Sequence, residues 1–391
     1  MCNPRRRVDR RRPVAPGLPG TVSRAAGARV AVAAVLLGSA TGSLHAQGPD
    51  SAHAHATPTP AAHAPGYPLA PTPVLDLHSL GARIALSGYI SARLTHHNDS
   101  TAMVVNRARL TAQIAPLPYM GVRLQADFSS GQTGRTRADS SVAGFTLTDG
   151  YAELAAPTSR PGTVADLRPA LIAGQFKAPF SLEYLTPFSI LKTVDRSQAV
   201  DSLAIKRDIG VLGRVGWRHW ASLAAAVLNG AGPNATANPD NQLLAVSRLT
   251  LTPVSFAELS IKVSDQGSDH AWGYDGRLLW RDLTVEGETV FRERPTSPTT
   301  RVDAGGGYAL IAFRVLRWLE PVYKYDRYWD TSFTTEDGSV TSATNRTWNV
   351  VGVNLRSVPE WLRLQLDWEL RNERPTPGRT NWLVAQVVAI F

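Results

Sequence analysis

From Gly81 onward, short segments of the chain alternate strictly between apolar and polar residues. The clearest segment spans residues 360–371, with the sequence EWLRLQLDWELR. Its apolar set is Leu362, Leu364, Leu366, Trp368 and Leu370, and its polar set is Arg363, Gln365, Asp367, Glu369 and Arg371. Segments 107–114, 122–128 and 257–263 repeat this period of two, which places successive side chains on opposite faces of a strand. The pattern therefore predicts an all-β protein.

Counting these segments from Gly81 gives about sixteen strands of roughly ten residues, the length that crosses a bilayer at a tilt. The predicted strands begin near Ile84, Arg107, Tyr119, Phe145, Ala165, Arg207, Trp220, Leu243, Phe256, Trp272, Leu283, Val302, Trp318, Trp348, Trp361 and Asn381. A water-soluble sandwich also alternates, with its apolar face inward. The alternation alone therefore leaves two architectures open.

The connections between the predicted strands distinguish these architectures. Short joints such as 216–219, 252–255 and 357–360 alternate with long polar joints such as 229–241 and 371–380. Outer-membrane barrels have short turns at one end, longer loops at the other and an even number of antiparallel strands. The sequence therefore predicts a transmembrane antiparallel β-barrel whose apolar face contacts lipid.

Tryptophan placement favours the same architecture. Only Trp368 lies well inside a predicted strand. The others flank short turns (Trp217, Trp220, Trp280, Trp318 and Trp361) or long loops (Trp272, Trp329, Trp348 and Trp382). Two aromatic belts at the level of the lipid headgroups would produce this distribution.

The last segment, NWLVAQVVAIF, is predicted to be the closing strand of the barrel. Leu383, Ala385, Val387, Ala389 and Phe391 share its lipid side, and closure removes the edge that such a strand would otherwise expose. A terminal Phe preceded by apolar residues at every second position also resembles the signal by which the barrel assembly machinery recognises its substrates. Phe391 is therefore a candidate assembly signal.

The N-terminal region is predicted to carry an export signal. Residues 1–46 contain eight Arg, one acid (Asp9) and an apolar run at 30–38, which is typical of a cleaved signal peptide. Residues 47–80 are rich in Ala, Pro and His and are predicted to be a disordered linker before the barrel at 81–391. The only cysteine, Cys2, lies in the leader, so the mature chain has no thiol for a disulfide or a metal.

The charge of the chain gives no support to a nucleic-acid partner. The formal net charge is +9, of which residues 1–46 supply 8 − 1 = +7, so 9 − 7 = +2 remains for the rest. We predict no cofactor and no metal site. The triplet Gly305 to Gly307 falls inside a predicted strand and indicates a bulge or a close approach of two chain segments rather than a phosphate-binding loop.

The connection at 176–206 is much longer than the others and is the third external loop by position. Long loops in compact folds are usually functional, and we predict that this one folds inward and narrows the pore. The alternative is an external loop that packs only on its neighbours. Its charges are mixed: Lys177, Lys192, Arg196 and Lys206 against Glu183, Asp195 and Asp201.

The run GQFKAPFSLEYLTP, the later VDRS and the following KRDIGVLGRVG resemble the phosphate-selective porins of the O and P type. RARLTAQIAPLPYMGVRLQADFS and DGYAEL are similar to earlier strands of that family, so the likeness is good from about 88 to 216. The resemblance implies a sixteen-stranded channel, often trimeric, through which small anions diffuse. It also implies that Lys177, Arg196 and Arg207, which match motif positions, contribute to anion attraction.

The sequence therefore predicts an outer-membrane porin for small solutes, chiefly anions such as phosphate. The predicted pore residues are Lys177, Lys192, Arg196, Lys206 and Arg207 in or beside the long loop, and Arg107, Arg109, Arg123 and Arg363 on the lumen face of strands. Four acids on the same face oppose a strong phosphate preference: Asp127, Glu258, Asp367 and Glu369.

Two other functions remain open, a lipase-like barrel enzyme and a non-conducting structural barrel. The enzyme has little support, because the chain contains no G-x-S-x-G motif. His96, His97, His219 and His270 also lie in predicted loops or turns without evident Ser and acid partners. No catalytic residue is therefore predicted.

Overall fold

The computed structural model describes residues 74–77, 82–117, 119–129, 145–155, 167–297, 299–334, 338–375 and 378–391. The predicted signal peptide, 1–46, lies outside the described residues, as does the predicted linker, 47–80, apart from 74–77.

In the described residues, seventeen strands form one antiparallel sheet, and sixteen of them, β2 to β17, close into a barrel. The barrel strands are β2 (Ala82–His97), β3 (Ser100–Leu117), β4 (Met120–Asp127), β5 (Thr146–Ala155), β6 (Leu167–Lys177), β7 (Arg207–Trp217), β8 (Ala221–Leu228), β9 (Leu244–Val254), β10 (Ala257–Gln266), β11 (Asp269–Trp280), β12 (Leu283–Ser297), β13 (Thr300–Phe313), β14 (Leu319–Thr334), β15 (Val340–Arg356), β16 (Leu362–Arg374) and β17 (Gly378–Ile390). Each strand pairs with its neighbours in sequence, and β17 pairs with β2 from Trp382 opposite His97 to Ile390 opposite Tyr89. The predicted all-β barrel of about sixteen strands is confirmed.

The two faces of the strands carry the expected residues, with the polar face inside. On β16, Leu366 and Trp368 are 37% and 51% exposed, whereas Asp367 and Glu369 are buried. A water-soluble sandwich would bury its leucines and expose its carboxylates. The barrel therefore presents its apolar face outward, as an environment of lipid requires.

Two strands begin well before their predicted starts. β3 starts at Ser100 rather than near Arg107, and β15 starts at Val340 rather than near Trp348. Both extensions pair with the preceding strand as a longer hairpin, in residues that were predicted to be a long loop. The first residues of each extension are exposed. A strand without a buried face needs no apolar alternation, so the sequence pattern does not reveal these ends.

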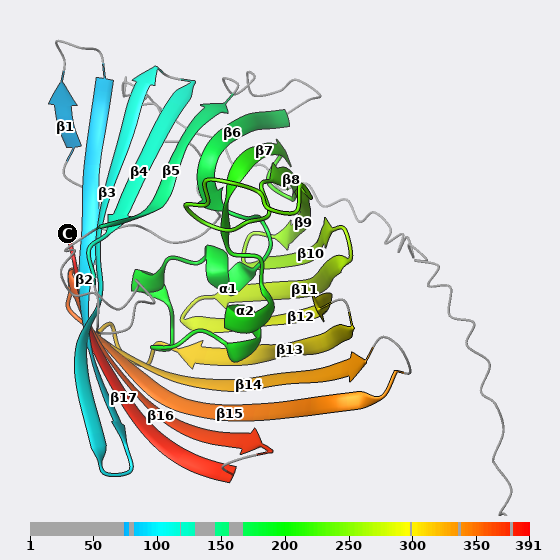
Figure 1. Ribbon diagram of the computed structural model, residues 1–391. Coiled ribbons are helices and arrows are strands. Elements are labelled where there is room, and N and C mark those ends of the chain that lie inside the picture. The colour runs from blue at the N-terminus through cyan, green and yellow to red at the C-terminus, as the bar shows by residue number, and fades with distance from the viewer. Residues whose placement is uncertain are drawn as a thin grey trace, which may run out of the picture. The chain divides into compact units, whose positions relative to one another are not determined.

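The edge of β2 carries both ends of the described chain. The C-terminal Phe391 exchanges two backbone hydrogen bonds with Gly88, at 2.8 and 3.0 Å. Beyond that point β1 (Val74–Leu77), which lies in the predicted linker, pairs with Ala82 to Ala85 of β2. β3 pairs with the other edge of β2, so β1 and β17 pair with the same edge of β2, and β1 lies beyond the end of β17 (Figure 1).

The long connection between β6 and β7 contains three short helical segments: α1 (Leu182–Leu185), the 3₁₀ helix Phe188–Ile190 and α2 (Gln198–Leu203). Figure 1 shows α2 against β12 and β13 on the concave side of the sheet. No helix in the described part of the chain combines the length and the apolar character needed to cross a membrane.

The glycine triplet in β13 explains how α2 reaches the sheet. A Cβ atom on Gly306 would lie 2.9 Å from the Cβ of Ala199 in α2 and closer still to the Arg327 carbonyl oxygen. No real Cβ tolerates such contacts, so only glycine allows the helix to pack here. The pairing of β13 with β14 runs without a register shift, so the triplet marks a close approach and not a bulge.

Candidate pore-lining site

The segment between β6 and β7 is attached to inward-facing side chains on distant strands. The backbone N–H of Glu183 donates to Glu288 on β12 at 3.0 Å, and that of Val194 donates to Asp367 on β16 at 2.7 Å. Asp326 on β14 accepts from the Ser197 hydroxyl at 2.8 Å and from the Gln198 N–H at 2.7 Å. We call Glu288, Asp326 and Asp367 the anchoring wall.

Donors on the same strands complete these attachments. The Lys324 ammonium donates to the Asp195 carbonyl oxygen at 2.6 Å, and the Gln365 amide donates to the Leu191 carbonyl oxygen at 3.0 Å. The side chains of the anchoring wall are almost fully buried beneath the segment. Their carboxyl oxygens therefore accept hydrogen bonds from buried backbone N–H groups, which would cost free energy if they were left unpaired.

A second set of charges gathers between the segment and strands β3, β4, β6 and β7. We call it the basic cluster, and its members are Arg107, Arg109, Arg123, Lys177, Arg196 and Arg207. The sequence predicts all six as pore residues, on strands and in the long loop. The fold brings them together.

Three aromatic rings hold most of the basic cluster in place. Arg107 lies 4.0 Å above the Phe188 ring, and Arg196 lies 5.1 Å from the centre of the Tyr184 ring. Tyr89 stacks on Phe188 with 6.4 Å between ring centres. Guanidinium groups stack favourably on aromatic faces, so the rings position these cations without neutralising them.

Only two carboxylates in the described part of the chain contact the basic cluster through ion pairs. Asp127 binds Arg109 at 2.7 Å, and Asp149 binds Arg207 at 2.7 Å and Arg123 at 3.3 Å. The six basic side chains of the cluster therefore outnumber the carboxylates that pair with them. Within the described residues, the Arg107 Nε and one Arg207 terminal nitrogen are buried without a hydrogen-bond acceptor.

The other three predicted loop and strand cations lie elsewhere. Lys192 binds Glu320 at 2.7 Å, and Arg363 binds Glu360 in the β15–β16 turn. Burial lowers the pKa of the Lys192 ammonium by more than the Glu320 carboxylate raises it. Lys206 is exposed. The structure therefore does not bring these three residues into the basic cluster.

The four acids predicted to oppose anions are all engaged. Asp367 accepts from Val194, as described above, and Asp127 binds Arg109. The Glu369 carboxylate accepts from Arg371 at 2.8 Å, and Glu258 lies 3.5 Å from Arg277. Each acid therefore has a local partner that reduces its effect on a passing ion.

Sequence reasoning missed the aromatic residues and one ion pair. Tyr184 and Phe188 lie in an irregular segment without periodicity, so no pattern places them beside arginines. Arg93 on β2 binds Asp195 in the segment at 2.6 Å. The alternation along β2 could have identified Arg93 as an inward residue, because it shares a face with the buried Tyr89 and Ser91.

Three of the four histidines considered in the sequence contact polar groups. His96 contacts the Thr101 hydroxyl at 2.8 Å, His97 the Asn381 carbonyl oxygen at 3.1 Å, and His270 the Asp265 carboxylate at 2.6 Å. All three hydrogen bonds are exposed to solvent. Among the same described residues, no group of three or more His, Cys, Asp or Glu could hold a metal ion.

Comparisons by sequence gave no relatives: no protein-family model and no curated protein matches the chain. The predicted resemblance to phosphate-selective porins of the O and P type therefore gains no support.

Comparisons by structure gave outer-membrane barrels. The chain is similar to the outer membrane channel DcaP of Acinetobacter baumannii, with a TM-score of 0.56, 12% identity, and coverage of 80% of this chain and 98% of that one. An anion-selective porin from Comamonas acidovorans matches with a TM-score of 0.55 and 10% identity, over 79% and 100% of the two chains. The trimer form of OmpT, an outer membrane protein of Vibrio cholerae, matches with a TM-score of 0.56 and 9% identity, over 80% and 100%. At these identities the comparisons show the fold, which is that of the porin-type outer-membrane β-barrel.

Proposed function

We propose that this chain is an outer-membrane porin through which small anions diffuse passively. The observation that carries the proposal is the basic cluster, in which six basic side chains face two carboxylates and five of the six lie against aromatic rings. Rings of Arg and Lys side chains are the usual lining of anion and phosphate pores. The anion selectivity stated for the Comamonas acidovorans porin is consistent with this proposal.

The proposed mechanism is electrostatic attraction at a narrowed section of the lumen. The segment from Phe176 to Lys206 folds inward, and its residues Lys177 and Arg196 face the arginines of β3 and β4. A low-dielectric wall concentrates the field of these charges in the remaining water-filled path, so the local anion concentration rises. Arg123 keeps a quarter of its side chain exposed, so a hydrated anion can contact it during passage.

Reversal potential in a potassium chloride gradient tests this proposal. The triple variant Arg107→Gln, Lys177→Gln, Arg196→Gln should shift the selectivity of purified protein in a planar bilayer toward cations, most clearly at low salt where screening is weakest. Lys206→Gln is the matched control, because this exposed lysine lies in the same connection outside the basic cluster. An unchanged reversal potential in the triple variant would rule out the mechanism, and absence of conductance in the natural protein would rule out the pore.

The proposal includes the cellular context predicted from the sequence. The chain is exported, and its signal peptide, residues 1–46, is cleaved off. The mature protein resides in outer-membrane lipid, can assemble as a homotrimer and has no enzymatic activity. Phe391, whose backbone exchanges two hydrogen bonds with Gly88, serves as the signal to the assembly machinery. Deleting Phe391 should reduce the heat-modifiable folded form in cells more than it reduces synthesis.

A further inference from the structure

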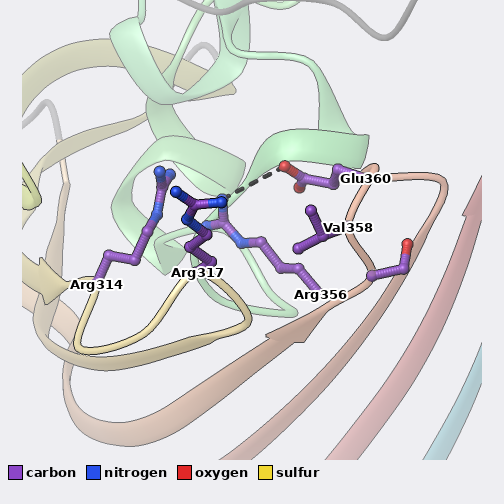
Figure 2. A pocket seen from close by; sticks show the side chains of 6 residues that line it. Arg314, Arg317, Arg356, Val358 and Glu360 are labelled. Carbon is purple, nitrogen blue, oxygen red and sulfur yellow. Dashed lines mark ion pairs between the residues drawn. The ribbon is translucent and has the colours of Figure 1, made fainter.

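A pocket of about 310 Å³ lies at the short-turn end of the barrel, away from the basic cluster. It is formed between the β13–β14 turn and the β15–β16 turn, and its lining residues are Arg314, Arg317, Arg356, Ser357, Val358 and Glu360. Figure 2 shows the guanidinium groups of Arg314, Arg317 and Arg356 converging on one another. Three like charges so close together repel unless an anion lies between them.

Protein carboxylates neutralise only part of this charge. Arg356 binds Glu320 and lies 3.6 Å from Glu360, which also binds Arg363. Burial alone would raise the pKa of Glu360, but Arg363 and Arg356 together lower it below the usual range, so Glu360 is ionised at neutral pH. The lining therefore carries three cations and one anion, a net 3 − 1 = +2.

Two of the arginines are free to receive a ligand. Within the described residues, the side chains of Arg314 and Arg317 are exposed and make no hydrogen bond or ion pair. The Arg356 side chain is 7% exposed, and its buried Nε has no acceptor in the described part of the chain. A buried donor without an acceptor costs free energy, which an oxyanion in the pocket would recover.

The surroundings place this pocket at the height of the lipid headgroups. Leu316, Trp318 and Trp361 on the same two turns are each about half exposed, at 46%, 50% and 55%. Exposed tryptophans of this kind mark the interface between hydrocarbon and water.

We propose that this turn pocket binds a phosphate-type oxyanion. Guanidinium groups match the paired oxygens of phosphate and favour it through charge-assisted hydrogen bonds. Phospholipid headgroups and free inorganic phosphate carry the same group, and the experiment separates these two sources. The site does not depend on the proposed selectivity of the pore, because no residue of the basic cluster lines it.

The test compares the double variant Arg314→Gln, Arg317→Gln with Arg281→Gln. Arg281 is the matched control, because it lies on another short turn, beside Trp280, and does not line the pocket. Inorganic phosphate is titrated calorimetrically into folded protein in detergent, and retained phosphatidylglycerol is measured by native mass spectrometry after release from lipid nanodiscs. The basic cluster is unaltered in both variants, so its own phosphate binding contributes equally.

We expect the double variant to lose affinity for one probe by about tenfold or more, while Arg281→Gln keeps it. Loss confined to inorganic phosphate identifies a soluble ligand, and loss confined to phosphatidylglycerol identifies a headgroup site. Glu360→Gln should strengthen binding of the same probe. Equal binding of both probes by the double variant and the control, or no binding of either probe to the natural protein, would overturn the inference.

Discussion

The basic cluster and the anchoring wall line the same barrel, yet their charges have different partners. On the anchoring wall, Asp326 and Asp367 bind backbone N–H groups of the β6–β7 segment and are fully buried. In the basic cluster, Arg107 and Arg196 lie on aromatic rings, and Arg123 keeps a quarter of its side chain exposed. The sign of a charge on the lumen face therefore does not by itself decide its electrostatic effect on a passing ion. The effect also depends on whether that charge is already paired within the protein.

The largest effect should follow from breaking the anchoring wall. Asp326→Ala removes the acceptor of two hydrogen bonds from Ser197 and Gln198. We expect docking of the segment to weaken by about 2 kcal/mol, which raises the undocked population roughly thirtyfold. Limited proteolysis of the segment in folded protein would measure this population.

Asp326→Asn is the control for this substitution, because an amide oxygen can still accept one hydrogen bond. Equal cleavage rates for Asp326→Ala and the natural protein would mean that the wall does not hold the segment.

The second-largest effect is expected on ion selectivity, when one carboxylate of the basic cluster and one of the anchoring wall are neutralised in turn. Asp149→Asn frees Arg207 and Arg123 in the basic cluster, so the ratio of anion to cation permeability should rise about two- to threefold. Asp367→Asn removes a charge of the same sign from the anchoring wall, where the carboxylate already binds Val194. The reversal potential of the Asp367→Asn variant should shift by less than half as much as that of the Asp149→Asn variant. A larger shift for Asp367→Asn would reverse our assignment of the two regions.

A smaller effect concerns pH and the segment itself. Burial raises the pKa of Glu183 to about 8, although Lys324 and the Ser197 N–H oppose this increase. Folded protein then binds more protons than unfolded protein between the ordinary glutamate pKa of 4.5 and about 8, so docking of the segment weakens as pH rises through this window. Protease protection of the segment should fall across the window, and Glu183→Gln should flatten the profile. A slope that persists in Glu183→Gln would assign the titration to another group.

The smallest effect is expected for the predicted cations that lie outside the basic cluster. Lys192→Gln, Arg363→Gln and Lys206→Gln should each leave the reversal potential close to that of the natural protein. Lys192 and Arg363 are paired with carboxylates, and Lys206 is exposed to screening by salt. A shift as large as that of Arg196→Gln in any of them would extend the selective region beyond the basic cluster.

The sequence by itself determined the barrel and the face on which each strand residue lies. A period of two assigns Asp367 and Arg363 to one side and Leu366 and Trp368 to the other, because successive side chains of a strand point in opposite directions. It also identified Arg107, Arg109 and Arg123 as inward residues. Local geometry is sufficient for these predictions, so they hold without knowledge of any distant contact.

Only the tertiary structure decided which charges meet. Arg107 and Phe188 are far apart in the sequence, and so are Asp326 and Ser197, and nothing periodic connects either pair. Closure of the barrel and the path of an irregular segment bring them into contact. Lys192 and Lys177 illustrate the consequence, because both are lysines of one connection. Lys192 pairs with the Glu320 carboxylate, whereas Lys177 donates to the backbone carbonyl oxygens of Tyr184 and Leu185 at 2.8 and 3.1 Å. Electrostatic interactions depend on distance and burial, and the order of residues along the chain specifies neither for groups that meet across a barrel.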